Sequence, residues 1–163
     1  MRAAIITVST SRAAGQLPDE GGEALSGFAR EIGADVAATE IVPDDQGKIE
    51  WALRHYSDTE ACDLILTTGG TGFSPDDVTP EATRAVIQRE APGIAEALRA
   101  ASREHTHNWM LSRGIAGIRG RTLIVNFPGS PKSIGQAGEA IGRALPHAVA
   151  LLRDGARGPH HEH

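Results

Sequence analysis

Short apolar runs alternate along this chain with longer stretches in which apolar residues recur at every third or fourth position. Four of the runs are typical of buried strands, at residues 3–8, 35–42, 64–67 and 122–126. The longer stretches indicate helices over residues 21–32, 44–57, from 79 onward, 94–103 and from 130 onward. Strands that alternate with helices predict a parallel sheet with helices packed on both of its faces.

Two of the predicted helices carry start signals. In Thr79-Pro80-Glu81, we expect the threonine to cap the helix, the proline to take its first position and the glutamate to face the helix dipole. Ser130-Pro131 begins the last helix in the same way. The apolar stripe that follows predicts one continuous helix and includes Ile134, Ile141, Leu145, Ala148 and Leu152.

The size of the chain is that of one ordinary domain. Its 163 residues fall within the usual range, and we see no internal repeat or linker that would divide them. We therefore predict a single domain over residues 1–154, followed by a polar, disordered tail over residues 155–163. The apolar runs are far shorter than the roughly 18 residues of a membrane span, so we expect no membrane insertion.

Charge and cysteine content narrow the function classes. The chain has 16 Lys and Arg against 21 Asp and Glu, a formal charge of −5, which argues against nucleic-acid binding because that needs a basic face. Cys62 stands alone, which excludes an internal disulfide and a cysteine-based zinc site, and core packing is its expected role. A single thiol fits a reducing compartment, and we expect the cytoplasm.

Glycine-rich or serine-rich segments follow three of the predicted strands, at residues 9–12, 68–72 and 126–132. In an open α/β sheet, ligands bind beyond the carboxyl ends of the strands. If the strands are parallel, all three segments crowd the same edge of the sheet. Glycine is also frequent: 19 of the 163 residues are glycine, or about 12%, against a usual ~7%. Such an excess marks places where the backbone approaches another group closely.

The segment Thr68-Gly69-Gly70-Thr71-Gly72 follows a buried strand and exposes backbone N–H groups with few side chains in the way. Such a nest holds anionic oxygens, although a tight turn is the alternative interpretation. It is not a P-loop, because no Gly-Lys-Ser/Thr follows, and it lacks the third glycine of a dinucleotide-binding fingerprint.

Carboxylates stand beside this segment. Asp76 and Asp77 come just before a predicted helix start, and oxygen ligands of this kind suit Mg²⁺, which is usually held by one or two carboxylates plus substrate phosphates. Asp44 and Asp45 follow another strand, where one is expected to cap the next helix and the other to face the same crevice. For each pair, capping alone is the competing interpretation.

The start of the last helix is a further candidate anion site. Ser130 would cap it, and Lys132 in its first turn adds a positive charge to the free N–H groups and the dipole. An ordinary cap with an exposed lysine is the alternative. The sequence has no G-x-S-x-G elbow and no convincing His or Asp partner for Ser9, so nucleophilic serine hydrolysis is disfavoured.

Taken together, T-G-G-T-G with D-V-T-P-E-A (residues 68–72 and 77–82) and N-F-P-G-S-P-K (126–132) resemble the MogA/MoaB family of molybdenum-cofactor biosynthesis. They are similar to the G domain of gephyrin, and related sequences occur in MoeA and CinA-like proteins. The resemblance implies a three-layer α/β/α sandwich with a mostly parallel central sheet, and a homotrimer. It also implies adenylyl transfer from Mg-ATP to molybdopterin, which gives adenylylated molybdopterin and pyrophosphate.

Carried onto this chain, the resemblance assigns catalytic and metal-binding roles to Asp77 and Asp44. Asp76, which has no counterpart in the family pattern, adds a possible further metal ligand. The resemblance also implies contacts with the two substrates, ATP and molybdopterin, for Thr68, Gly69, Gly70, Thr71, Gly72, Ser112, Arg113, Pro128, Gly129, Ser130 and Lys132.

The chain departs from the family pattern at two places. Family members usually have arginine where this chain has Asp76, and the first loop reads Ser9-Thr10-Ser11-Arg12 where Ser-Asp-Arg is common. These changes keep alternatives open. One is a molybdopterin-binding trimer without catalysis, another is a CinA-like nucleotide hydrolase, and a third is a flavodoxin-like domain of unrelated function.

Overall fold

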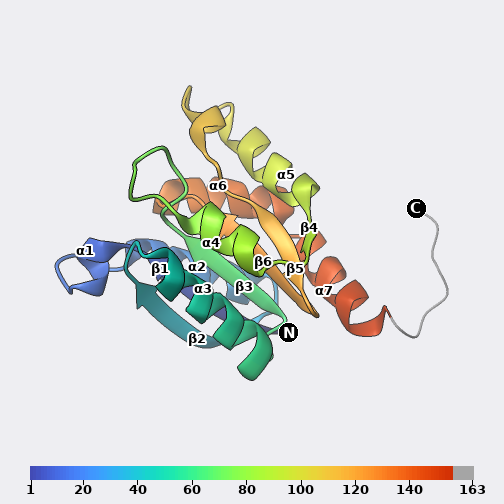
Figure 1. Ribbon diagram of the computed structural model, residues 1–163. Coiled ribbons are helices and arrows are strands. Elements are labelled where there is room, and N and C mark those ends of the chain that lie inside the picture. The colour runs from blue at the N-terminus through green and yellow to red at the C-terminus, as the bar shows by residue number, and fades with distance from the viewer. Residues whose placement is uncertain (156–163) are drawn as a thin grey trace.

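A computed structural model describes residues 1–155, and its centre is a twisted sheet (Figure 1). Within these residues the strand order is β2-β1-β3-β6-β5-β4. The first four strands of this order are mutually parallel, whereas β5 runs antiparallel to β6 and β4 antiparallel to β5. The strands are β1 Arg2–Val8, β2 Asp35–Val42, β3 Leu64–Thr68, β4 Arg89–Glu90, β5 Ala116–Arg119 and β6 Thr122–Phe127.

Helices cover both faces of the sheet, so the predicted three-layer sandwich with a mostly parallel sheet is confirmed (Figure 1). One core cluster joins α2, α5, α6 and α7 to one face, and a second joins α3 and α4 to the other. The helices are α1 Thr10–Ala13, α2 Glu20–Glu31, α3 Gln46–Arg54, α4 Thr79–Val86, α5 Pro92–Ser102, α6 Pro131–Ile141 and α7 Ala144–Asp154. A π-helical turn, η1 His55–Thr59, extends α3, and a 3₁₀ turn, η2 Trp109–Leu111, precedes β5.

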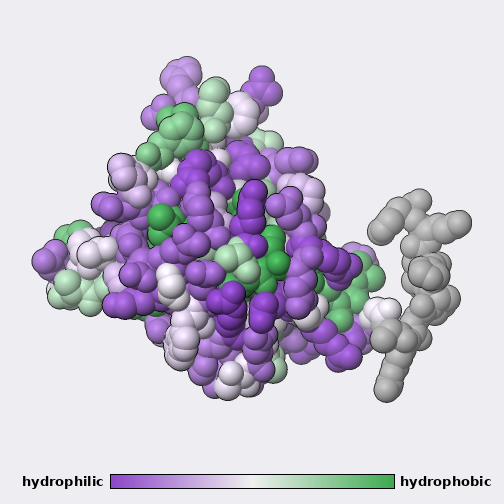
Figure 2. All heavy atoms as spheres, in the orientation of Figure 1, coloured by the Kyte–Doolittle hydropathy of each residue, from purple (hydrophilic) through white to green (hydrophobic). Residues whose placement is uncertain are grey.

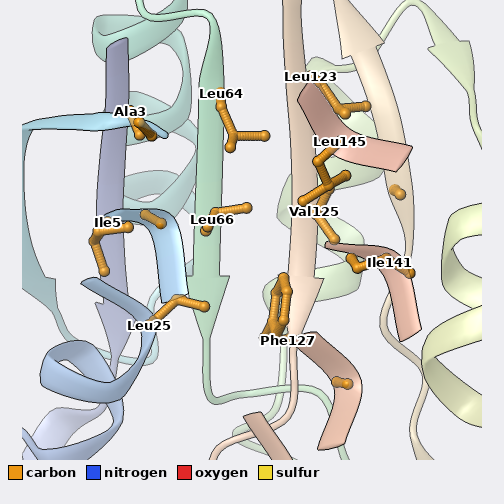
Figure 3. Close-up of a cluster of buried hydrophobic side chains, with 14 of the residues drawn as sticks. Ala3, Ile5, Leu25, Leu64, Leu66, Leu123, Val125, Phe127, Ile141 and Leu145 are labelled. Atoms are coloured by element: carbon orange, nitrogen blue, oxygen red, sulfur yellow. The ribbon is translucent and has the colours of Figure 1, made fainter. Parts of the chain in front are cut away.

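Alternate strand residues divide between the two cores, because successive side chains of a strand point to opposite faces. Figure 3 shows one core, in which β1, β3 and β6 contribute Ala3, Ile5, Leu64, Leu66, Leu123, Val125 and Phe127. The side chains between them, such as Ile6, Ile65 and Ile124, enter the other core and are completely buried. Full burial of one such side chain stabilises the fold by about 1.5–3 kcal/mol.

The surface is largely polar. Figure 2 shows polar and charged residues over most of the face in view, with small hydrophobic areas between them. Cys62 lies in the core, as predicted, and burial raises the pKa of its thiol. No helix within residues 1–155 has the length and hydropathy needed to span a membrane. The predicted tail, apart from Gly155 at the end of α7, falls outside the described residues.

The last predicted helix is in fact two helices, so the prediction of one continuous helix is wrong. The break falls at Gly142 and Arg143, between α6 and α7. Pro146 explains it, because proline has no N–H to donate to the carbonyl of Gly142 and its ring clashes with that carbonyl in a continuous helix. In the structure, Pro146 lies in the first turn of α7, where an N–H has no partner anyway.

Three short elements, β4, β5 and α1, were not predicted. β5 is four residues long and contains Gly117, which interrupts any apolar pattern. A Cβ at Gly117 would lie 2.5 Å from the Cδ1 of Ile87, so close packing against the end of α4 explains the glycine. β4, with two residues, and α1, with four, are also too short to leave a periodic signal.

Thr79 is not the cap of α4, contrary to the prediction. The helix begins at Thr79 itself, Val78 takes the cap position, and no side chain caps the first turn. The Thr79 hydroxyl instead donates a hydrogen bond to the carbonyl of Gly69, at 2.9 Å. Its side chain is completely buried against the glycine-rich loop. The hydroxyl of Thr79 therefore stabilises that loop and does not cap the helix.

Candidate active site

The carboxyl ends of the parallel strands surround a cavity of about 230 Å³. The loops after β1, β2, β3 and β6 all reach it, and Figure 1 shows α1 and the β3–α4 loop at this edge. The expected convergence of separate loops is therefore present. The residues that line the cavity are Thr7, Val8, Ser9, Arg12, Asp19, Gly21, Asp44, Thr68, Gly69, Gly70, Asp77 and Gly129.

The glycine loop has a backbone that side chains would obstruct. Gly69 and Gly70 have φ angles of +92° and +68°. A Cβ at Gly69 would lie 2.4 Å from the carbonyl oxygen of Val8, and one at Gly70 would lie 2.3 Å from Oγ1 of Thr79. The Thr68 hydroxyl donates to the carbonyl of Pro128 at 2.7 Å and so joins this loop to the one after β6.

The amides of this loop are free donors. Within residues 1–155, no backbone or side-chain acceptor takes a hydrogen bond from the N–H groups of Gly70, Thr71, Gly72 or Phe73. Unpaired N–H groups on successive residues are the donors of an anion-binding nest. Gly70 lies in the wall of the cavity, so the loop brings backbone donors to the edge of that cavity.

Of the two aspartates after β2, one caps the next helix and the other lines the cavity, as the sequence suggested. Asp45 caps α3 and accepts a hydrogen bond from the N–H of Lys48 at 2.9 Å. Asp44 lines the cavity, and its Oδ2 accepts from the backbone N–H and the hydroxyl of Thr10 at 3.0 and 2.9 Å. These bonds fix the Asp44 carboxylate against the first loop and leave Oδ1 without a protein donor among residues 1–155.

Asp77 lines the same cavity as Asp44. Its Oδ2 accepts from the N–H of Ser74 at 3.1 Å, which closes the turn that precedes α4. Asp76 lines an adjacent cavity of about 520 Å³ at the first loop, together with Asp44. The structure thus places Asp44 at both cavities, Asp77 at one and Asp76 at the other.

The donor set fits Mg²⁺ in the way that nucleotide enzymes bind it. Within residues 1–155, no three His, Cys, Asp or Glu side chains gather as a complete metal site. Magnesium is usually held by one or two carboxylates together with substrate phosphates, so a complete protein cage is not needed. Asp44 and Asp77 face one cavity beside a phosphate nest and could hold the ion jointly with a nucleotide.

Sequence reasoning placed Arg12 in a segment at this edge of the sheet without giving it a role, and it missed Asp19 as a lining residue. Among the described residues, Arg12 is the one cationic residue in the wall of the cavity, and its Nε donates to the carbonyl of Pro18 at 2.9 Å. Asp19 caps α2, where it accepts from the N–H of Gly22 at 3.0 Å and from the hydroxyl of Thr7 at 2.9 Å. The run Asp-Glu-Gly-Gly at residues 19–22 was a readable signal for this helix start.

Several residues that the resemblance assigned to substrate contact lie outside this cavity. Ser112 and Pro128 border a separate void of about 20 Å³. Ser130 caps α6 and accepts from the N–H of Ser133 at 3.2 Å, while the side chain of Lys132 is exposed in the first turn of that helix. A role for these residues in holding substrate stays a prediction.

Arg113 also lies outside the cavity, and its guanidinium binds protein groups. It donates to the carbonyls of Gly72 and Asp77, both at 2.7 Å, and pairs with the carboxylate of Glu81. The hydrogen bond from Arg113 lowers the pKa of Glu81 below its usual range.

Comparisons with known proteins agree with this geometry. Residues 4–147 match the family model described as a probable molybdopterin binding domain. The chain is 46% identical over 113 residues to a molybdopterin adenylyltransferase of Helicobacter pylori, a match that covers 69% of this chain and 64% of that protein. It is 47% identical over 114 residues to the molybdenum cofactor synthesis protein cinnamon of Drosophila melanogaster, covering 70% of this chain and 19% of that protein.

The chain thus spans less than two thirds of the length of these curated relatives. Among solved structures, the molybdopterin biosynthesis enzyme MoaB of Thermus thermophilus superposes with a TM-score of 0.87 at 46% identity. That match covers 93% of this chain and 95% of the other. The fold therefore has a counterpart in a protein of known structure.

Proposed function

Because this chain belongs to the family of probable molybdopterin binding domains, we propose that it is a molybdopterin adenylyltransferase of molybdenum-cofactor biosynthesis. The substrates would be Mg-ATP and molybdopterin, and the products adenylylated molybdopterin and pyrophosphate. Relatives that carry this enzyme name support the proposal. The observation that carries it is the shared cavity, where Asp44, Gly70, Asp77 and Gly129 come together from three separate loops.

The chemistry matches the side chains that are present. The terminal phosphate of molybdopterin is largely ionised at neutral pH, since a phosphate monoester has its second pKa near ~6. One of its oxygens forms a bond to the α-phosphorus of ATP, and the bond from that phosphorus to the bridging oxygen breaks. Pyrophosphate leaves with the electron pair. The nucleophile needs no side-chain base, and among residues 1–155 no histidine or cysteine lines the cavity.

Each part of the cavity has a task in this reaction. The free amides of the glycine loop would hold phosphate oxygens and orient the α-phosphorus for in-line attack, because positioning supplies most of the catalysis in phosphoryl chemistry. Asp44 and Asp77 would hold Mg²⁺, which neutralises the charge of the phosphates when bound. Arg12 would add a positive charge to the same wall.

The decisive experiment measures pyrophosphate release from Mg-ATP with and without molybdopterin, together with the binding of Mg-ATP by calorimetry. An adenylyltransferase releases pyrophosphate only with the pterin and forms an equal amount of adenylylated pterin. Binding of the substrates without turnover would identify a non-catalytic molybdopterin-binding protein. Hydrolysis of ATP without the pterin would identify a nucleotide hydrolase. Either of these outcomes would overturn the proposal.

We further propose a homotrimer in the cytoplasm. Support for the trimer comes from the family resemblance, and support for the location from the lone, buried thiol, which suits a reducing compartment. The molar mass from light scattering tests the assembly, since a trimer of this chain has three times its 17.1 kDa. A monomer at micromolar concentration would contradict the proposed trimer.

A further inference from the structure

The guanidinium of Arg113 forms hydrogen bonds with two points of the β3–α4 loop, Gly72 and Asp77. Nε donates to the carbonyl of Gly72 and Nη2 to the carbonyl of Asp77, both at 2.7 Å. Nη1 pairs with the carboxylate of Glu81 in the first turn of α4. The backbone N–H of Arg113 adds a further bond, to the carbonyl of Thr71 at 2.8 Å. One residue therefore holds the glycine loop, the turn before α4 and the helix itself.

The residues on either side of Arg113 are fixed by hydrogen bonds from α5. Nη1 of Arg99 donates to the carbonyl of Gly114 at 2.7 Å and to that of Ser112 at 3.4 Å. Gly114 also passes close to β6, since a Cβ there would lie 3.3 Å from the carbonyl oxygen of Asn126. The two neighbours of Arg113 are thus fixed to α5 and β6, and its side chain extends from a rigid base.

These bonds decide where the free amides of the glycine loop point. In a planar trans peptide, the carbonyl and the following N–H point in opposite directions. The carbonyls of Thr71 and Gly72 face Arg113, so the N–H groups of Gly72 and Phe73 face away from it. Both N–H groups are without a protein acceptor within residues 1–155. Arg113 therefore presents these donors on the side of the loop that is opposite to itself.

We infer that Arg113 is a positioning residue for adenylyl transfer, an inference that rests on the proposed function. It acts through the backbone of the β3–α4 loop, where it fixes the place of Asp77 and the direction of the loop amides. This differs from the contact with substrate that the resemblance implied, because the guanidinium is occupied by three protein acceptors.

Arginine is needed for this task. Its planar fork has five donors and serves acceptors in several directions at once, whereas a lysine ammonium is a single point charge. Arg113→Lys would retain the positive charge beside Glu81 but could not hold the carbonyls of Gly72 and Asp77 together. The loop would then move relative to the cavity.

Arg119→Lys is a matched control. Arg119 makes a similar set of bonds, to Asp58 at 3.0 and 2.8 Å and to the carbonyl of Val86 at 2.9 Å, but none of these partners belongs to the β3–α4 loop. Its side chain is 22% exposed, against 33% for Arg113, so the structural loss is comparable. Both variants are measured by amide hydrogen exchange at Ser74, Asp77 and Thr79, whose N–H groups are hydrogen-bonded within or to the loop. Steady-state kinetics with Mg-ATP and molybdopterin give the second readout.

The inference predicts faster exchange in the loop for Arg113→Lys and a kcat lower by about 10²-fold, with a smaller change in KM. Arg119→Lys should show neither effect at the loop. Unchanged exchange for Arg113→Lys would overturn the inference, as would faster exchange with a wild-type kcat. If Arg113→Lys does not fold, Arg99→Lys loosens the same base, and the same pattern in weaker form is expected.

The two proposals fail in different ways. If the wild-type protein forms no adenylylated pterin, the proposed function is wrong. Hydrogen exchange of the two arginine variants then still decides whether Arg113 fixes the loop, because it needs no substrate. If the wild type is active and the two variants behave alike in both measurements, the inference about Arg113 is wrong and the proposed function stands.

Discussion

The hydroxyl of Thr79 donates a hydrogen bond to the carbonyl of Gly69, at 2.9 Å and away from solvent. The backbone N–H of Thr79 also donates to the carbonyl of Gly70, at 3.1 Å. The first turn of α4 and the glycine loop therefore move as one unit. Thr83, one turn later, joins this unit to β6, because its hydroxyl donates to the Thr79 carbonyl and accepts from the amide of Asn126.

Removal of the Thr79 hydroxyl should weaken both the fold and nucleotide binding. Thr79→Val keeps the shape but leaves the Gly69 carbonyl without its donor, which costs about 1–3 kcal/mol of the free energy of unfolding. The freed loop should also bind Mg-ATP more weakly, as calorimetry would show. Thr122→Val is the control, since Thr122 is buried and donates to the Cys62 carbonyl at 2.6 Å at the other end of the sheet. Equal nucleotide affinity for the two variants would contradict this prediction.

A side chain at Gly70 should be more harmful than one at a glycine of similar backbone conformation. Gly70→Ala places a Cβ in the left-handed region and only 2.3 Å from Oγ1 of Thr79. Gly120→Ala also has a positive φ, but nothing lies within 4 Å of its Cβ. The left-handed conformation alone costs about 1–2 kcal/mol, so urea unfolding should show that loss for Gly120→Ala and a larger one for Gly70→Ala. A smaller loss at Gly70 would refute the described packing.

The Glu81–Arg113 pair should contribute to stability in a pH-dependent manner. Arg113 lowers the pKa of the Glu81 carboxyl, and such a group stabilises the fold above its unfolded pKa of about 4.3. That contribution is lost as the pH falls through the lower folded pKa. We therefore expect the stability of Glu81→Gln to vary less than that of wild type as the pH falls below about 4.3.

The effect is small, because 45% of the Glu81 side chain is exposed to solvent. An exposed ion pair contributes at most about 1 kcal/mol, so urea titrations at several pH values are needed to resolve it. Asp58→Asn offers a comparison, since Arg119 lowers the pKa of Asp58 in the same direction. Parallel curves for wild type and Glu81→Gln would show that the pair contributes nothing.

Much of the fold followed from the sequence because three of the parallel strands, β1, β3 and β6, are buried on both faces. Their apolar runs set the order of elements, and parallel strands bring their carboxyl ends to one edge, which placed Asp44, Gly70 and Asp77 together. Pro146 was a readable signal for the break between α6 and α7. β5 had no such signal, because tertiary contacts at Gly117 define it more than local preference does.

The role of Arg113 could not be predicted from the sequence. Its partners include main-chain carbonyls 36 and 41 residues away in the chain, and a carbonyl has no side-chain identity that a motif could show. The hydroxyl of Thr79 is a similar case, because local rules assign a threonine before Pro80 to capping. Both residues act on the site through the backbone of a neighbouring loop.

The most direct test of the account is pterin-dependent pyrophosphate release by Asp77→Asn, compared with wild type and with Asp45→Asn. Asp77 lines the cavity, whereas Asp45 caps α3, where asparagine serves equally well. We predict that wild type and Asp45→Asn turn over alike and that Asp77→Asn loses about 10²-fold or more in kcat. Full turnover by Asp77→Asn, with pyrophosphate and adenylylated pterin formed at the wild-type rate, would contradict the central claim.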